Sequence, residues 1–523
     1  MKGPDLPFKI LALAPFLGPE CPAWDKTPLP VEPSNLERAM EQLNPACAVS
    51  VFGDLHPDER IELTFSKIKD FHPDGLVQNN PTLRNLWEAK SWVEEAGKQN
   101  LSPQEINARL VGWPNLPAIK VEPAPRKPRT TSKNSVDKIL DMVALPEEQS
   151  GASQEGQDAA QQIEGILKRN LQFVFSDETF RMLEASWRGL ELLSGQVNPR
   201  DTDLRIEIVP VSLDSLNETL AALTAEVIDA LPSLILVDLG FDSSPRCLDL
   251  LERVGQFAET LLVPAITWIR PEFFHIDAWE DIKKLGFLPH YLEEAPYAKW
   301  QSLKKSSPSG WLAVTCNRFL ARYPYGKDNK PRRIPFAEAN PLWISPVWAL
   351  GSLIGRSFSE AGWPTRFTDW QQIRLEDLPL STVDPSKPLP TEVNFDRERI
   401  DQFISSGMVP LATTQGKDIA FVPDETTIAG VSLRYGLLVS RITQLVLWCR
   451  DHFEKGLGGS DLETSLRQAF RVFWEKSGHV GPESLEVSAG QPDSDGRIPI
   501  RISLEPSGEI LLSRKQVELN FMW

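Results

Sequence analysis

The spacing of apolar and polar residues in the first part of the chain alternates between strand and helix signals. A near-continuous apolar run over 8–14 is typical of a buried strand. Apolar residues then recur at helical spacing after Ser34, which is suited to cap a helix N-terminus. Strict alternation over 60–66 predicts a half-buried strand, and a second helical pattern follows it. We therefore predict a small α/β domain over residues 1–114.

A proline-rich and polar stretch follows this domain. Its composition over 115–162 predicts a flexible linker. Inside the linker a short amphipathic helix is predicted over 135–145. Its apolar face consists of Val136, Ile139, Leu140 and Val143. A short helix between two polar stretches is the form of a docking peptide. The pattern alone leaves open whether this helix docks on a partner or packs on its own domain.

The remaining residues, 163–523, predict a large domain of α/β class. Helical patterns separate apolar strands at 203–212, 233–240 and 261–269, which is the β-α-β-α-β order of a doubly wound sheet. Two alternating runs separated by Pro-Ser-Gly predict a C-terminal β-hairpin that ends in an exposed strand. The residues of that last strand that we expect to serve assembly are Val517, Leu519, Phe521 and Trp523.

Charge and cysteine content narrow the classes of function. The net charge of the 523-residue chain is −17, which argues against nucleic acid as a main partner. The densest basic run, 126–133, lies in the predicted linker. None of the five cysteines forms a CxxC pair, as a reducing cytoplasmic compartment permits. No apolar run reaches the roughly 18 residues of a membrane helix, so we expect no membrane insertion.

Motifs that carry chemistry are lacking in the sequence. There is no phosphate loop, dinucleotide fingerprint, zinc-protease motif or nucleophile elbow. None of the six histidines falls in an i, i+4 pair or beside a second ligand. We therefore expect no catalytic residue, no metal and no cofactor. An enzyme built on the doubly wound fold is kept as the alternative of another class.

Five motifs occur in order in the large domain: FRMLEASWRGLELL, PEFF, APYAKWQSLKKS, RFLARYPYG and PTEVNFDRERIDQFISSGMVPL. Together they resemble the large contractile-sheath subunit of bacterial type VI secretion systems, the TssC family, over about 360 residues. The positions that match the family are Leu183, Trp187, Arg188, Gly189, Trp300, Arg318, Arg322, Pro324, Tyr325 and Gly326. The resemblance implies packing roles, with Trp187 in the core and Gly189 allowing a neighbouring element to approach.

The first domain is more faintly similar to the small sheath subunit, TssB, through FKILALAPF, LTFSKIKDFHPDGLVQ and LRNLW. The chain thus resembles a small and a large subunit fused into one. It departs from the family in a shorter small-subunit part. A further departure is the segment 327–345, which is short and basic where the family has a longer acidic insert.

The resemblance implies a structural protomer that polymerises into a helical tube around an inner tube and contracts. Its implied partners are further copies of itself, the inner-tube protein and baseplate components. An AAA+ recycling unfoldase of the ClpV type is a further implied partner, with 135–145 as its docking helix. A non-polymerising relative that caps a sheath or adapts it to a baseplate is the runner-up.

Overall fold

The computed structural model describes residues 6–523 except 33, 52–59, 100, 114–115, 117–118, 120–153, 196–202, 328, 382–387, 455, 480 and 512. The predicted docking helix at 135–145 lies outside the described residues. Contacts divide the chain into two compact units. Unit 1 comprises 1–45, 182–323 and 341–523, and unit 2 comprises 46–181 and 324–340. These units do not follow the predicted boundaries at 114 and 163, because the first strand pairs inside unit 1.

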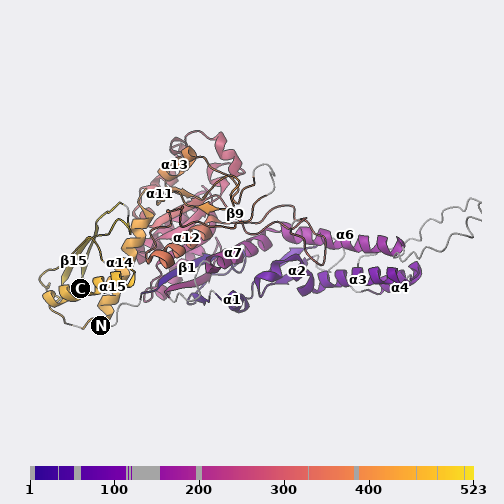
Figure 1. Cartoon of the computed structure of the whole chain (residues 1–523), viewed down its shortest axis with the longest axis horizontal. Coiled ribbons are helices and arrows are strands. Elements are labelled where there is room, and N and C mark those ends of the chain that lie inside the picture. The colour runs from indigo at the N-terminus through magenta and orange to yellow at the C-terminus, as the bar shows by residue number, and fades with distance from the viewer. Residues whose placement is uncertain are drawn as a thin grey trace, which may run out of the picture. The chain divides into compact units, whose positions relative to one another are not determined.

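Unit 1 is built on a seven-stranded sheet in the order β11-β8-β7-β6-β1-β5-β2, of which Figure 1 labels β1. Its strands are β1 (Phe8–Ala14), β2 (Leu29–Val31), β5 (Leu204–Pro210), β6 (Leu234–Phe241), β7 (Ala265–Ile269), β8 (Leu312–Cys316) and β11 (Met408–Pro410). All neighbouring pairs are parallel except β2 with β5. The predicted doubly wound α/β class is confirmed.

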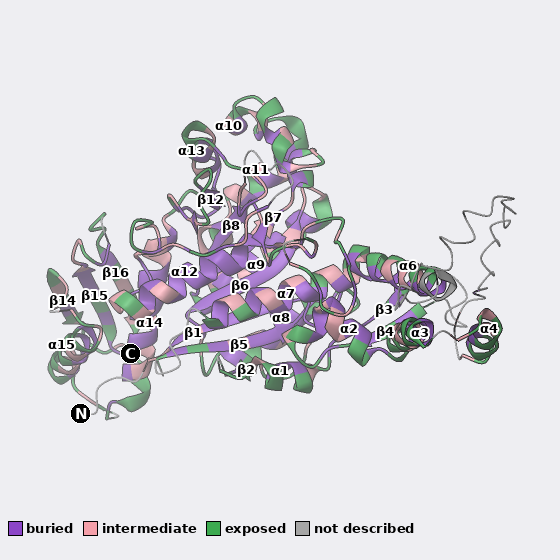
Figure 2. Cartoon of the chain, turned by 45° about the vertical axis from the view of Figure 1, so that its right-hand side comes forward, coloured by how far each residue is buried: buried purple, intermediate pink, exposed green. Residues whose placement is uncertain are grey.

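The N-terminal strand β1 occupies the interior of this sheet. It pairs along its whole length with β5, and Ile10–Leu13 also pair with β6. Six of its seven residues have no exposed surface, as a strand covered on both faces requires. Figure 2 shows β1, β5 and β6 mostly in the colour of buried residues. The run at 8–14 was predicted as a buried strand, but its position between two strands of the large domain was not.

Helices and short strands cover this sheet and extend unit 1. The longer helices are α1 (Leu36–Leu43), α8 (Leu216–Val227), α9 (Pro245–Leu261), α12 (Pro346–Ala361) and α13 (Arg397–Ser405). Shorter helical elements are η2 (Pro271–Phe274), η3 (Trp279–Lys284), α10 (Leu288–Tyr291), η4 (Ala295–Tyr297), α11 (Ala298–Lys304) and η5 (Ser307–Trp311). Two small antiparallel pairs are β9 (Phe319–Leu320) with β10 (Trp343–Ile344) and β12 (Ala412–Thr413) with β13 (Ala420–Phe421).

The C-terminal part of unit 1 has an apolar cluster of its own. It consists of α14 (Leu433–His452), α15 (Gly459–Lys476) and a sheet of β14 (Ser484–Ala489), β15 (Pro499–Glu505) and β16 (Val517–Met522). The predicted hairpin is β15 with β16. Strand β14 pairs on the other side of β15 and was not predicted, nor was α15.

Unit 2 contains a β-hairpin and a set of helices. Its elements are β3 (Ala46–Ser50), β4 (Arg60–Thr64), η1 (Ile68–Phe71), α2 (Pro73–Asn79), α3 (Pro81–Lys98), α4 (Pro103–Val111) and α6 (Gln154–Ser176). Helices α3 and α6 lie side by side (Figure 1). The start of α6 corrects the prediction that the linker runs to 162. The helix begins nine residues before 163, since Ala159, Ala160 and Ile163 bury an apolar face.

The predicted start of the strand at 261–269 also differs from the structure. The apolar run 261–269 was predicted as one strand, but Leu261 ends α9 and β7 begins only at Ala265. Leu262 adopts a left-handed conformation with φ 53° and ends the helix. A short apolar run does not by itself distinguish a buried helix end from a buried strand.

Candidate functional site

The Trp-Arg-Gly motif lies on α7 (Glu178–Gly195). The residues of this helix from Met182 onward belong to unit 1. Leu183 and Trp187 have no exposed surface. The Trp187 indole donates a hydrogen bond of 3.1 Å to the carbonyl of Phe16, and the two rings pack 5.0 Å apart. Phe16 follows β1, so this motif contacts the N-terminal segment directly.

Gly189 lies against the Trp348 side chain of α12. A Cβ atom at position 189 would come within 2.3 Å of Cδ1 of Trp348. The Trp348 indole in turn donates a 2.7 Å hydrogen bond to Asp238 on β6. The glycine therefore leaves room for a fully buried tryptophan that joins α12 to the sheet.

Glu184, one turn before Arg188, is the buried charge at the centre of a second contact. Nε of Arg188 lies 2.7 Å from Glu184, and Arg322 binds both carboxylate oxygens at 2.8 and 3.0 Å. Burial opposes ionisation of Glu184, but attraction by Arg322 and Arg188 outweighs it and lowers the carboxyl pKa. The first motif is thus bound to the Arg-Phe-x-x-Arg motif by a bidentate ion pair.

The other family-matching positions of unit 1 contact residues of the remaining motifs. Arg318 forms a bidentate ion pair with Glu392 of the PTEVNF motif, at 2.7 and 3.1 Å. Trp300 packs edge-on against Phe273 of the PEFF motif, with centroids 5.1 Å apart. The Tyr297 hydroxyl donates to the carbonyl of Phe273 at 2.9 Å. The five motifs therefore supply one another's packing partners in the interior of the fold.

Pro324, Tyr325 and Gly326 belong to unit 2. Tyr325 is buried and packs edge-on against the rings of Phe175 and His72. Its backbone N–H donates to Glu338 at 3.2 Å. The N–H of Gly326 donates to the carbonyl of Asn329 at 3.1 Å and closes a turn.

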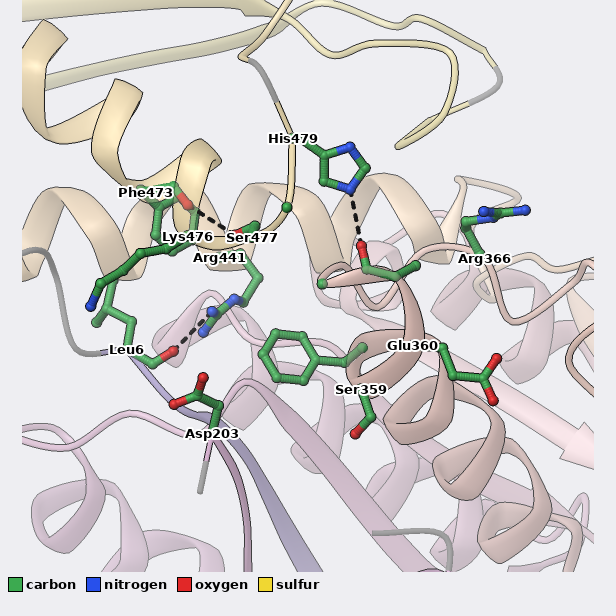
Figure 3. A pocket seen from close by; sticks show the side chains of 14 residues that line it. Leu6, Asp203, Ser359, Glu360, Arg366, Arg441, Phe473, Lys476, Ser477 and His479 are labelled. Carbon is green, nitrogen blue, oxygen red and sulfur yellow. Dashed lines mark hydrogen bonds between the residues drawn. The ribbon is translucent and has the colours of Figure 1, made fainter. Parts of the chain in front are cut away.

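Arg441 of α14 holds the backbone that leads into β1. Its guanidinium donates to the carbonyls of Leu6 and Pro7 at 2.9 and 3.2 Å. The rings of Phe8, Phe358 and Phe473 surround it at 5.3–5.9 Å. Burial lowers the pKa of Arg441 to about 10. Figure 3 shows Arg441 beside Leu6 in a pocket of about 490 Å³.

The predicted assembly residues lie on β16 and just beyond it. Val517, Leu519, Phe521 and Trp523 all pack against the apolar cluster of their own C-terminal sheet. Strand β16 pairs with β15 on one side, and in the described part of the chain no strand pairs with its other side. That side offers backbone groups to a further strand. The four side chains therefore pack within their own sheet, and the outer backbone edge of β16 is unpaired among the described strands.

Within the described residues we find no cluster of three or more His, Cys, Asp or Glu placed to hold a metal ion. No described helix is both long and apolar enough to cross a membrane. Sequence reasoning missed Glu184, Glu392 and Arg441. One feature of the sequence could have indicated Glu184: it is an acidic residue next to Leu183 on the apolar face of a predicted helix.

Comparison with known families agrees with this arrangement. The family model described as "EvpB/VC_A0108, tail sheath N-terminal domain" (VipB) matches residues 157–230 and 232–428, just over half of the chain. The chain belongs to this type VI tail-sheath family. A second model, "Type VI secretion system, VipA, VC_A0107 or Hcp2", matches residues 1–108. The predicted resemblance to a small and a large sheath subunit in one chain is confirmed.

Individual relatives are more distant from this sheath-family chain. The type VI secretion system sheath protein TssC1 of Pseudomonas aeruginosa is 25% identical over 304 residues. The match covers 50% of this chain and 60% of that relative. Two solved structures from the anti-feeding prophage show low similarity. Its contracted helical sheath has a TM-score of 0.33 at 11% identity, covering 64% of this chain and 77% of that one. The structure of its baseplate has a TM-score of 0.35 at 10% identity, covering 65% of this chain and 76% of that one.

Proposed function

We propose that this protein is the structural protomer of a contractile type VI secretion sheath and that it works without catalysis, in the cytoplasm. The observation that carries the proposal is the position of β1. The segment matched by the small-subunit model supplies an interior strand to the sheet of the segment matched by the large-subunit model. One chain therefore contains both halves of a protomer in a single hydrogen-bonded sheet.

Assembly in this proposal proceeds by heterologous contacts between copies. Such contacts generate an open helix when their rotation does not close a ring. The outer edge of β16 can accept a strand from a neighbouring copy by β-augmentation, which would keep copies linked while they move. Contraction would then be a rigid-body rearrangement of protomers around the inner-tube protein.

Two further partner classes belong to the proposal. Baseplate components would bind one end of the tube. An AAA+ unfoldase would bind the helix predicted at 135–145, through Val136, Ile139, Leu140 and Val143. That segment lies between α4 and α6 in the sequence.

Negative-stain electron microscopy of the purified protein, across concentration and salt, tests the proposal. Regular hollow tubes are the expected result. Monodisperse particles that persist after addition of the inner-tube protein would overturn it and favour the cap or baseplate-adaptor role instead.

A further inference from the structure

A basic segment interrupts the acidic surface of this protein. Residues 327–333 contain four cations and one acid, Asp328, for a formal charge of +3 in a chain whose net charge is −17. Lys327, Lys330 and Arg332 have exposed side chains, and Arg333 is half-buried. We call these four residues the basic patch. The whole patch belongs to unit 2.

The basic patch is held by backbone contacts that leave its charges available. Both carboxylate oxygens of Asp74 accept backbone N–H groups of the patch, from Arg332 at 2.9 Å and Arg333 at 2.8 Å. The Arg333 guanidinium stacks over Trp87 at 4.7 Å. Among the described residues, none of the four cations forms an ion pair with a carboxylate.

Buried residues on either side hold the segment in place. Ile334 and Phe336 are buried, and Phe336 packs on Phe175 with centroids 5.0 Å apart. The turn between Gly326 and Asn329 closes the other end. The cations are therefore presented on a fixed loop, so that binding costs little further ordering of the backbone.

We infer that the basic patch is an assembly contact that binds the acidic surface of a second copy of this chain. This inference deepens the proposed sheath function and rests on it. A net charge of −17 makes copies repel each other once their surfaces come within the screening length, which is about 8 Å at physiological salt. A local patch of opposite sign then selects the one orientation in which two copies approach closely. The same net charge disfavours a nucleic-acid partner, whose binding requires a basic field over several phosphates.

The test compares the wild type with K327E/K330E/R332E and with a matched control, K283E/K305E/K417E. The control makes the same change of charge at three exposed lysines of unit 1 that form no ion pair among the described residues. Circular dichroism and unfolding midpoints confirm that both variants fold. Self-association is measured by sedimentation and electron microscopy at low and physiological salt, and binding of a 30-base-pair DNA duplex by fluorescence anisotropy.

We expect the patch variant to need at least about tenfold more protein to assemble, roughly 1.4 kcal/mol, while the control assembles like the wild type. Zero-length carbodiimide crosslinking of mixed isotope-labelled copies should join Lys327 or Lys330 to a carboxylate of another copy. A third possible result is that the wild type forms salt-sensitive dimers, the patch variant does not, and no sample forms tubes. That result would support the basic patch as a contact between copies and contradict the proposed sheath.

Three results would overturn the inference. Tubes from the patch variant at the wild-type concentration would leave the sheath proposal standing without this contact. Absence of any self-association in the wild type would contradict both the basic-patch contact and the proposed sheath function. Duplex DNA binding that only the patch variant loses, with self-association unchanged, would assign the patch to nucleic acid.

Discussion

At the scale of single residues, Gly189 tests whether close packing or helix propensity decides stability. Replacing a helical glycine with alanine gains up to about 1 kcal/mol of propensity. At position 189 the new Cβ would overlap the buried Trp348 ring, and overpacking costs about 1–3 kcal/mol. We expect Gly189→Ala to lower the denaturant midpoint.

The matched control for this prediction is Gly165→Ala on α6, where a Cβ would meet nothing within 4 Å. We expect that variant to unfold at a slightly higher denaturant concentration than the wild type. Equal behaviour of the two alanine variants would show that Trp348 yields its position without cost.

The buried ion pair of Glu184 gives a second prediction. Arg322→Met leaves a carboxylate with no exposed surface and only Arg188 beside it. Losing one partner of a buried pair costs about 3–5 kcal/mol, so we expect a large fall in the unfolding midpoint. The double variant Glu184→Gln/Arg322→Met should recover much of the loss, because it buries no unpaired charge.

Arg246→Met provides the exposed comparison for Arg322→Met. Its partner Asp214 and Arg246 itself are both mostly solvent-accessible. Loss of such a pair costs at most about 1 kcal/mol. If Arg322→Met were as mild as Arg246→Met, the ion pair between the two motifs would not hold the fold together.

Asp238 gives a prediction about how stability depends on pH. The sign is opposite to that expected for Glu184, whose pKa is lowered in the folded state. It is buried on β6, and burial raises its carboxyl pKa although Trp348 donates to it. The folded state therefore binds this proton more tightly than the unfolded chain does. The group favours folding at low pH, and this contribution is lost as the pH rises through the raised pKa.

Asp238→Asn keeps an acceptor for Trp348 and removes the charge. We expect the variant to exceed the wild type in unfolding midpoint at neutral pH, with the difference shrinking as the pH is lowered. Midpoints measured over a pH series check this. A pH-independent difference would mean that the Asp238 carboxyl has the same pKa in the folded and the unfolded protein.

At the scale of elements, the interior position of β1 predicts that the chain can be divided but that its parts depend on each other. Without β1, strands β5 and β6 would each expose an unpaired edge. We expect residues 1–120 and 150–523 to purify as a 1:1 complex when coexpressed and to be insoluble alone. Leu11→Asp, at a fully buried position of β1, should abolish copurification in a tag pull-down.

The success of sequence reasoning about these elements follows from what each pattern encodes. The run at 8–14 specified a buried strand because all but one of its residues are apolar. Its neighbours in the sheet depend on contacts almost 200 residues away, which local spacing does not encode. Similarly, periodicity found the apolar face of α7, whereas the pairing of Glu184 with Arg322 depends on the tertiary fold.

At the scale of the whole molecule, the fusion sets the ratio of the two subunit-like parts at one to one. It also makes pairing of β1 with β5 and β6 intramolecular, at a high effective concentration. Folding of the protomer then no longer depends on a second chain. In the proposed sheath, what remains between copies is the association of protomers, and the backbone edge of β16 is one strand edge open to it.

The outward edge of β16 gives the last prediction. Ile498 and Trp523 exchange both backbone hydrogen bonds. Since such pairs alternate along antiparallel strands, the N–H of Leu519 and of Phe521 points to β15, whereas that of Asn520 points away from it. Proline is tolerated in an edge strand where its missing N–H faces outward.

We therefore expect Asn520→Pro to leave the unfolding midpoint nearly unchanged and to suppress tube formation, because an incoming strand loses a donor and meets the proline ring. Phe521→Pro breaks the ladder with β15 instead and should lower the midpoint. Electron microscopy and denaturant unfolding of the two variants, side by side, separate assembly from folding. Wild-type tubes from folded Asn520→Pro would show that copies are joined elsewhere than at β16.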